Sequence, residues 1–159
     1  MEAIVELLQK NARFSSAEIA DRLDMDEAEV IRHIKELEEN GTIFGYHAVI
    51  DRERSGDTSV SAMIEIKLTP QRDGGFDKLA ERIAKFDQVT NCYLMSGGYD
   101  LAVIVEGETL NDVARFVSER LSTVDGVIGT STHFQLKVYK QNGFIASAGF
   151  KPERLPVTP

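Results

Sequence analysis

The stretch Met95-Ser-Gly-Gly-Tyr-Asp-Leu-Ala-Val-Ile-Val105 places two glycines and one acid between two apolar, β-prone runs. This pattern predicts a β-hairpin whose turn needs the left-handed backbone angles that glycine adopts. The backbone amides of Gly97 and Gly98 and the carboxylate of Asp100 are expected at its tip. Two interpretations follow: a structural turn, or a site for a small zwitterion, in which the amides bind its carboxylate and Asp100 binds its ammonium.

The elements around this hairpin follow a recognisable order. Strand-like alternation of period two and helical spacing of apolar residues succeed one another along residues 60–139. The predicted elements are a strand over Val60–Thr69, a helix over Phe76–Ala84, hairpin strands over Val89–Ser96 and Tyr99–Glu106, a helix over Leu110–Leu121 and a strand over Val127–Tyr139. This order indicates an α+β, ferredoxin-like βαββαβ domain, with four antiparallel strands and both helices on one face. The other face of the sheet then needs a cover, for which a second subunit is the natural candidate.

The first half of the chain predicts three short helices with helix-turn-helix spacing. Ser15 and Glu18 form a capping box at the start of the second helix, and Asp26 is placed to cap the third. Asp24 occupies the turn between them, where a glycine is usual, but aspartate tolerates the left-handed conformation. Asn40-Gly41 ends the third helix, and the β-prone segment that follows is expected to supply a wing strand.

The third helix has two interpretations. Its outer side would offer Glu27, Arg32, His33 and Lys35 to double-stranded DNA, since arginine and lysine favour phosphates and guanine edges. The same charges are equally explained as the solvated face of a plain three-helix core. Residues 1–50 carry five Lys/Arg and eleven Asp/Glu, so this half holds −6 of the net charge of −8. A DNA-binding surface is usually basic, and no polybasic run is present.

Composition limits the remaining possibilities. A chain of 159 residues suffices for one average domain or two small ones, and no apolar run reaches the length of a membrane span. The single cysteine, Cys92, excludes a disulfide within the chain, and no signal peptide is recognisable, so a cytoplasmic location is expected. We predict a first domain over 1–50, a polar linker over 51–59, a second domain over 60–141, and a tail over 142–159 that is either an arm on a partner subunit or flexible.

The combination of motifs resembles the Lrp/AsnC (feast/famine) transcriptional regulators over residues 3–140. The resemblance rests on the helix-turn-helix, the segment Glu39-Asn-Gly-Thr-Ile-Phe-Gly-Tyr-His-Ala-Val-Ile50 and the Gly-Gly-Tyr-Asp100 hairpin. Thr69-Pro-Gln-Arg72 and Leu94-Met-Ser-Gly-Gly-Tyr-Asp100 are similar to a short Gram-positive branch. The resemblance implies a winged helix-turn-helix regulator that dimerises through its second domain, often assembles into octamers or filaments, and binds an amino-acid effector. The implied effector residues are Gly97, Gly98, Tyr99, Asp100, Thr130, Ser131 and Thr132.

The hydroxyl groups of the last strand have an alternative interpretation of their own. Thr130 and Thr132 share a strand face with Phe134 and Leu136, so they should be partly buried, and buried hydroxyls need hydrogen-bond partners. That need favours a ligand. Threonine is also common in strands for its β-propensity alone.

Enzymatic chemistry is poorly supported. The three histidines have no cysteine or acid at metal-ligand or triad spacing, and no phosphate loop or nucleotide fingerprint occurs. We therefore expect no enzyme, no metal and no cofactor other than an amino-acid effector. Two alternatives stay open: an amino-acid sensor that binds no DNA, and an enzyme like the sirohaem decarboxylases, which resemble the same architecture. The histidine- and arginine-rich segment of those enzymes is matched in Thr42–Ile50 only by His47.

Overall fold

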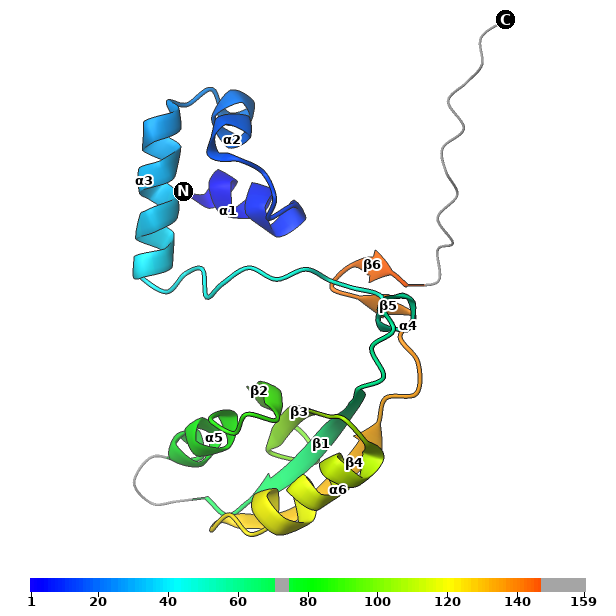
Figure 1. The fold of residues 1–159 in the computed structure, drawn as a ribbon. Coiled ribbons are helices and arrows are strands. Elements are labelled where there is room, and N and C mark those ends of the chain that lie inside the picture. The colour runs from blue at the N-terminus through cyan, green and yellow to red at the C-terminus, as the bar shows by residue number, and fades with distance from the viewer. Residues whose placement is uncertain (71–74, 147–159) are drawn as a thin grey trace, which may run out of the picture. The chain divides into compact units, whose positions relative to one another are not determined.

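A computed structural model describes residues 1–70 and 75–146 of the chain (Figure 1). The chain divides into two units, Met1–Val49 and the residues from Ile50 onward, and each is described here by itself. Within the described residues, no helix has the length and apolar character needed to cross a membrane.

The first unit is the predicted three-helix arrangement. It consists of α1 (Glu2–Lys10), α2 (Ser16–Leu23) and α3 (Glu27–Glu39). The predicted capping box is present at α2, because the Ser15 hydroxyl accepts the Glu18 N–H and the Glu18 carboxylate accepts the Ser15 N–H at 2.8 Å. The Ser15 N–H and the Ser15 hydroxyl both donate to the Glu18 carboxylate, and these two hydrogen bonds hold the pKa of Glu18 below its ordinary value. The helices enclose a small apolar core formed by Ile4, Leu8, Ile19, Ala20, Val30 and Leu37.

The turn between α2 and α3 depends on two aspartates. Asp24 ends α2 in the left-handed conformation, with φ 52° and ψ 50°, as its position in the motif predicted. Asp26 then starts α3 by accepting the Ala28 N–H at 2.9 Å. A non-glycine residue in the left-handed region is strained unless its side chain tolerates it, so the identity of residue 24 matters to this turn.

The wing strand expected after α3 is not formed within the chain. Residues 43–50 are all described, and they adopt no regular secondary structure. The Ile43 N–H donates to the Leu37 carbonyl at 2.9 Å, and the Tyr46 hydroxyl donates to Glu38 at 3.0 Å. The Phe44 side chain is fully exposed. This β-prone segment therefore has no strand partner among residues 1–70 and 75–146.

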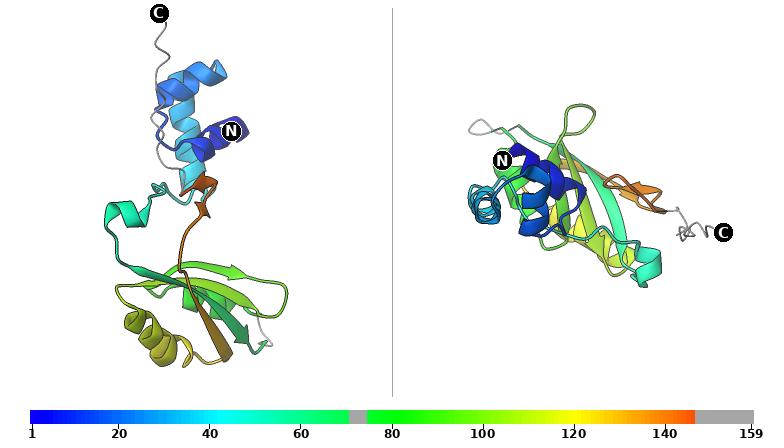
Figure 2. Two further views of the ribbon diagram at one scale, coloured as in Figure 1. Left: turned by 90° about the vertical axis from the view of Figure 1, so that its right-hand side faces the viewer. Right: turned by 90° about the horizontal axis from the view of Figure 1, so that it is seen from above.

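The second unit has the predicted βαββαβ order. Its four-stranded antiparallel sheet has the strand order β2-β3-β1-β4, and both helices lie on the same side of it (Figure 2). The elements are β1 (Val60–Leu68), α5 (Asp77–Ala84), β2 (Val89–Leu94), β3 (Leu101–Gly107), α6 (Leu110–Phe116), the π-helical turn η1 (Val117–Leu121) and β4 (Val127–Phe134).

Alternation along β1 separates a buried face from an open face. Ala62, Ile64, Ile66 and Leu68 belong to the core beneath the helices. The intervening residues face the other side of the sheet, because strand side chains alternate. On that open face Met63 lies between Ile104 of β3 and His133 of β4, according to the strand register. Both α5 and α6 lie on the opposite side of the sheet, so neither helix covers this face (Figure 2).

Three further segments, besides the expected wing strand, differ from the sequence-based expectation. The polar residues 51–59 contain a helical turn, α4 (Arg52–Ser55), and the Arg52 side chain pairs with Glu106 of β3 and donates to the Ser59 hydroxyl at 2.8 Å. The last strand of the sheet ends at Phe134 rather than Tyr139. Beyond it, β5 (Lys140–Gln141) and β6 (Phe144–Ile145) form a small hairpin, while residues 147–159 of the expected tail lie outside the described residues.

We predict that the stability of the first unit depends on how well the residue at position 24 tolerates the left-handed conformation. Asp24→Ala should lower its free energy of unfolding by about 1 kcal/mol, because alanine is strained in the left-handed region. Asp24→Asn should be close to neutral, since asparagine tolerates that region. Urea unfolding followed by circular dichroism measures both effects, and an Asp24→Ala protein as stable as Asp24→Asn contradicts the assignment.

Candidate functional site

The hairpin between β2 and β3 has a longer loop than predicted. The strands end at Leu94 and begin again at Leu101, and the Met95 N–H donates to the Asp100 carbonyl at 2.8 Å to close the loop. Gly97 has φ +145°, in the region that favours glycine, whereas Gly98 has an ordinary negative φ. A Cβ added to either glycine would meet no atom within 4 Å. The backbone of the loop is therefore open to an approaching group.

Asp100 ties this loop to the central strand. Its Oδ2 accepts the Leu68 N–H at 2.7 Å, and its own N–H donates to the Ile66 carbonyl at 2.9 Å. No sequence pattern predicts the Leu68 contact, because that contact depends on strand register. The Oδ1 atom of Asp100 has no hydrogen-bond partner among the described residues. The carboxylate thus has a structural role and keeps acceptor capacity for a ligand.

The hydroxyl residues of β4 are divided between the two faces of the sheet. Ile66 pairs with Leu101 on one side and with Thr130 on the other, so the hairpin and Thr130 lie at the same end of the sheet. They are separated by β1, two strand spacings or about 10 Å. Thr130 and Thr132 are half-buried on the helix side, as predicted, and the Thr130 hydroxyl lies 3.3 Å from the Ser122 hydroxyl.

Ser131 points to the opposite, open face. Its hydroxyl lies 3.3 Å from Nε2 of His133, which lies 3.4 Å from a Glu65 carboxylate oxygen. Both contacts use the same ring nitrogen, whereas a catalytic triad needs the serine and the carboxylate on different nitrogens. Among the described residues, no cluster of three potential metal ligands occurs. The structure therefore brings Thr130 and Thr132 to the helix side near the hairpin end and separates Ser131 from them.

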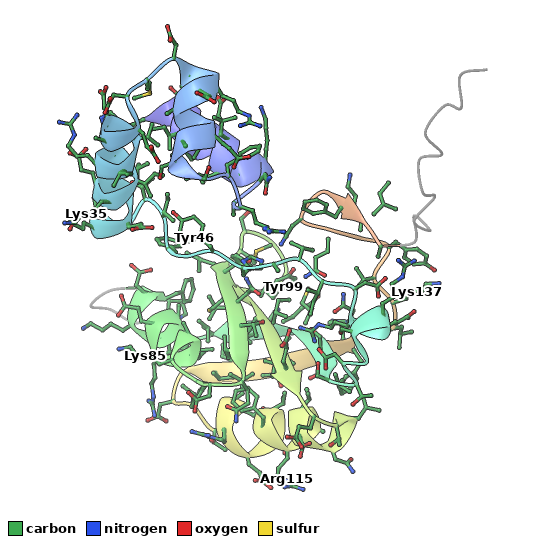
Figure 3. All side chains as sticks on the ribbon, turned by 45° about the horizontal axis from the view of Figure 1, so that its top comes forward. Lys35, Tyr46, Lys85, Tyr99, Arg115 and Lys137 are labelled. Atoms are coloured by element: carbon green, nitrogen blue, oxygen red, sulfur yellow. The ribbon has the colours of Figure 1, made fainter. Side chains whose placement is uncertain are left out.

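The residues proposed for DNA contact on α3 differ in how far their side chains are exposed. Arg32, Lys35 and Glu27 are exposed, and Lys35 lies on the side of the helix that faces away from α2 (Figure 3). Arg32 lies 3.7 Å from a Glu29 carboxylate oxygen, and Lys35 lies 3.6 Å from Glu39. Exposed ion pairs of this kind contribute at most about 1 kcal/mol, so phosphate can displace them.

His33 differs from the other three candidates. It is half-buried, and its Nδ1 atom is inaccessible and has no hydrogen-bond partner in the described part of the chain. Helical periodicity explains this position, since residue 33 follows the buried Val30 by three positions and shares its face. The outer surface of α3 thus presents Arg32 and Lys35 as its two cations.

Family models match both units of the chain. The model described as "Lrp/AsnC ligand binding domain" matches residues 61–144, and the model described as "winged helix-turn-helix DNA-binding" matches residues 2–43. The HTH-type transcriptional regulator YugG of Bacillus subtilis is 45% identical over 157 residues, which cover 98% of this chain and 95% of the relative.

Solved structures agree in fold. A transcriptional regulator of Neisseria meningitidis, solved as a complex with L-Met, is 25% identical with a TM-score of 0.68 and covers 87% of this chain and 89% of that one. The leucine response regulatory protein of Mycobacterium tuberculosis is 23% identical with a TM-score of 0.72, over 88% and 92% of the two chains.

We predict that the structural role of Asp100 can be separated from its charge. Asp100→Ala should lower the free energy of unfolding of the second unit by about 1–3 kcal/mol, because the partly buried Leu68 N–H loses its acceptor. Asp100→Asn retains an acceptor oxygen of the same shape and should cost less than about 1 kcal/mol. Chemical denaturation compares the two variants, and equal losses would show that the hydrogen bond to Leu68 contributes nothing.

Proposed function

The chain belongs to the Lrp/AsnC family of transcriptional regulators, and from this premise we propose that its operator binding responds to a small amino-acid effector held at the β2–β3 hairpin. Its relatives are DNA-binding regulators and not enzymes, so the decarboxylase alternative is abandoned. The single observation that supports the effector site best is the geometry of Asp100, whose carboxylate is fixed by the Leu68 N–H and keeps one oxygen without a partner among the described residues, on the same loop as the open glycines.

The hairpin offers complementary groups to both charged ends of an amino acid. The Oδ1 atom of Asp100, which has no partner in the part of the chain that the structure describes, accepts from an α-ammonium, and the open amides around Gly97 and Gly98 donate to an α-carboxylate. Tyr99, which lies on the same loop, supplies a half-exposed aromatic side chain (Figure 3). The complex of the Neisseria meningitidis regulator with L-Met supports an amino acid as the class of ligand.

The open face of the sheet supports the proposal that the effector controls the assembly of subunits. Met63 and Ile104 lie next to each other on this face, and Tyr93 is 52% exposed beside Ala102. A second copy that covers this face would bury these side chains, which favours a dimer. An effector bound where further subunits meet would then shift the assembly equilibrium by its differential affinity for the two states.

We predict that Arg32 makes a principal phosphate or base contact in the operator complex. Arg32→Ala should weaken binding to duplex DNA from the promoter of its own gene and reduce the slope of log affinity against log salt by about 1. Glu29→Gln should strengthen binding, because it frees Arg32 and removes a charge that repels phosphate. Fluorescence anisotropy over a salt series measures both.

The matched control for this experiment is Lys10→Ala, which removes one exposed cation from α1. If Arg32→Ala and Lys10→Ala behave alike, α3 does not read the operator through Arg32. If the wild-type protein fails to bind the promoter with or without amino acids, the acidic first unit indicates the alternative, a sensor that binds no DNA.

We predict that the effector response depends on the Asp100 charge. A thermal-shift screen against the twenty amino acids should identify an effector that, at 100 times its dissociation constant, stabilises the native protein by about 2.7 kcal/mol. Asp100→Asn should abolish that stabilisation and the effector-dependent change in sedimentation, while the dimer and basal DNA binding persist. An unchanged response in Asp100→Asn places the effector elsewhere, and a dissociated dimer makes Asp100 a structural residue only.

A further inference from the structure

The residues that follow β4 form an arm, a name we use for residues 135–146. The arm leaves the sheet at Gln135, whose N–H donates to the Ser61 carbonyl at 2.9 Å, and it ends in the β5–β6 ribbon. The Ala146 N–H closes the ribbon by donating to the Tyr139 carbonyl at 3.1 Å. Its strands have two residues each, and a two-stranded hairpin by itself is only marginally stable in water. Further contacts would therefore stabilise the ribbon.

The two faces of the ribbon carry different side chains. Lys140 pairs with Ile145 on one face, and Gln141 pairs with Phe144 on the other. Because strand side chains alternate, Tyr139 shares the face of Phe144, and we call this side the aromatic face. Tyr139 is 68% exposed and Phe144 is 60% exposed, so the aromatic face is uncovered in the single chain. Exposed aromatic side chains that lie together are typical of protein–protein interfaces.

The arm extends toward the side of the sheet that has no helices. Figure 2 shows the β5–β6 ribbon standing away from the sheet on the side opposite α6. The open face on this side carries Met63 and Ile104 on neighbouring strands, with Tyr93 further along the sheet. A second copy that covers the open face would therefore lie on the side to which the arm extends.

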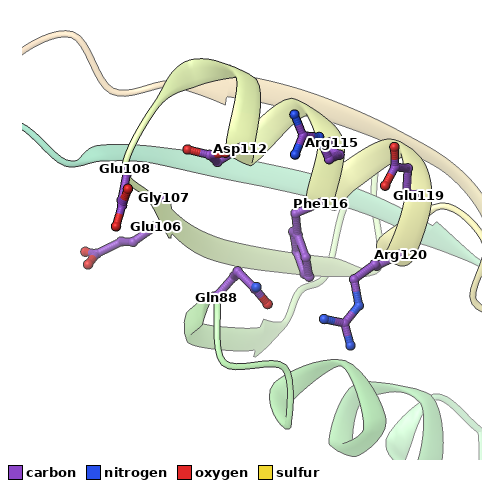
Figure 4. A pocket seen from close by; sticks show the side chains of 9 residues that line it. All are labelled: Gln88, Glu106, Gly107, Glu108, Asp112, Arg115, Phe116, Glu119 and Arg120. Carbon is purple, nitrogen blue, oxygen red and sulfur yellow. The ribbon is translucent and has the colours of Figure 1, made fainter.

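The opposite side of the unit presents a different surface. Beside α6 and η1 the exposed side chains are charged, as Glu108, Arg115, Glu119 and Arg120 show (Figure 4). The apolar residue among them, Phe116, is only 4% exposed and belongs to the core. This hollow offers no apolar surface to a second copy, whereas the open face and the arm do.

The charge of the arm also suits a second copy. Residues 126–146 contain no Asp or Glu, and Lys137 and Lys140 form no ion pair within the described residues. The whole chain has a net charge of −8, so a second copy attracts a basic arm. DNA would attract the lysines too, but protein–DNA interfaces are strongly polar, and the aromatic face is not.

We propose that the arm docks on a second copy of this chain through its aromatic face, which buries Tyr139 and Phe144 in the dimer. The inference rests on the proposed dimer through the open face and adds a second, separate contact to it. In a dimer with two-fold symmetry each copy gives one arm and receives one. Lys137 and Lys140 then lie at the polar rim of the contact.

A single tryptophan tests this docking, because the chain contains none. Tyr139→Trp places the reporter on the aromatic face, and Leu110→Trp places a control at the start of α6. In the single chain position 139 is more exposed than position 110, at 68% against 55%. Docking reverses this order. We expect acrylamide to quench Tyr139→Trp less than Leu110→Trp in the full-length dimer, with the emission of Tyr139→Trp shifted to shorter wavelength.

The effect on assembly is measured with a matched pair of neighbouring residues. Phe144 and Ile145 are equally exposed, at 60% and 61%, but lie on opposite faces of the ribbon. Phe144→Ser should raise the dissociation constant of the dimer about tenfold or more, because the loss of one buried aromatic side chain from each arm weakens the contact. Ile145→Ser should change it less. Sedimentation over a concentration series gives these constants, and both exposed positions leave the fold of the single chain intact.

Each other outcome overturns the proposal in a distinguishable way. A dimer in which Tyr139→Trp is quenched as strongly as Leu110→Trp has an undocked arm, and equal constants for Phe144→Ser and Ile145→Ser exclude the aromatic face. If Tyr139→Trp becomes protected only when duplex DNA is added, the arm contacts DNA instead. A wild-type protein that stays monomeric at micromolar concentration removes the arm contact and the open-face dimer together. The effector site at Asp100 is then still tested separately by the thermal-shift screen.

Discussion

The second unit depends on one constraint, the burial of alternate residues of β1 beneath two helices. Because β1 is central and pairs with both β3 and β4, the inward direction of Ile64 and Ile66 fixes the register of three strands at once. A shift of one residue would turn this entire set to the open face, at a cost of about 1.5–3 kcal/mol for each large side chain exposed. The hairpin loop and Thr130 meet the same residue, Ile66, only in this register.

Local signals made much of this structure predictable. The capping box at Ser15, the left-handed Asp24 and the alternation of β1 are each determined by neighbours in sequence, and each is present. Contacts between distant segments were not predictable in this way. The bond from Leu68 to Asp100 spans 32 residues, and the pairing of Arg52 with Glu106 spans 54. Such contacts depend on strand register. Apolar patterning limits the possible registers but does not identify which atoms come into contact.

Two further differences have local causes that the patterns did not include. Asn142 and Gly143 both have positive φ, at 47° and 89°, which is the geometry of a two-residue hairpin turn. This turn explains β5 and β6, where the expected tail was either an arm on a partner subunit or flexible. The segment after α3 has strand-forming residues but no partner strand within the described part of the chain, because β-propensity describes how side chains pack and does not supply a neighbouring strand.

Glu106 connects the sheet to the segment that follows the first unit. Its carboxylate pairs with Arg52, the first residue of α4, three positions after the first unit ends at Val49. Arg52 also lies 3.7 Å from Asp57, whose pKa is held below its ordinary value by hydrogen bonds from Ser59. The Arg52 guanidinium thus joins β3 to the residues that precede β1. The position of α4 therefore depends on the same strand register, which places Glu106 opposite Ser61 at the start of β1.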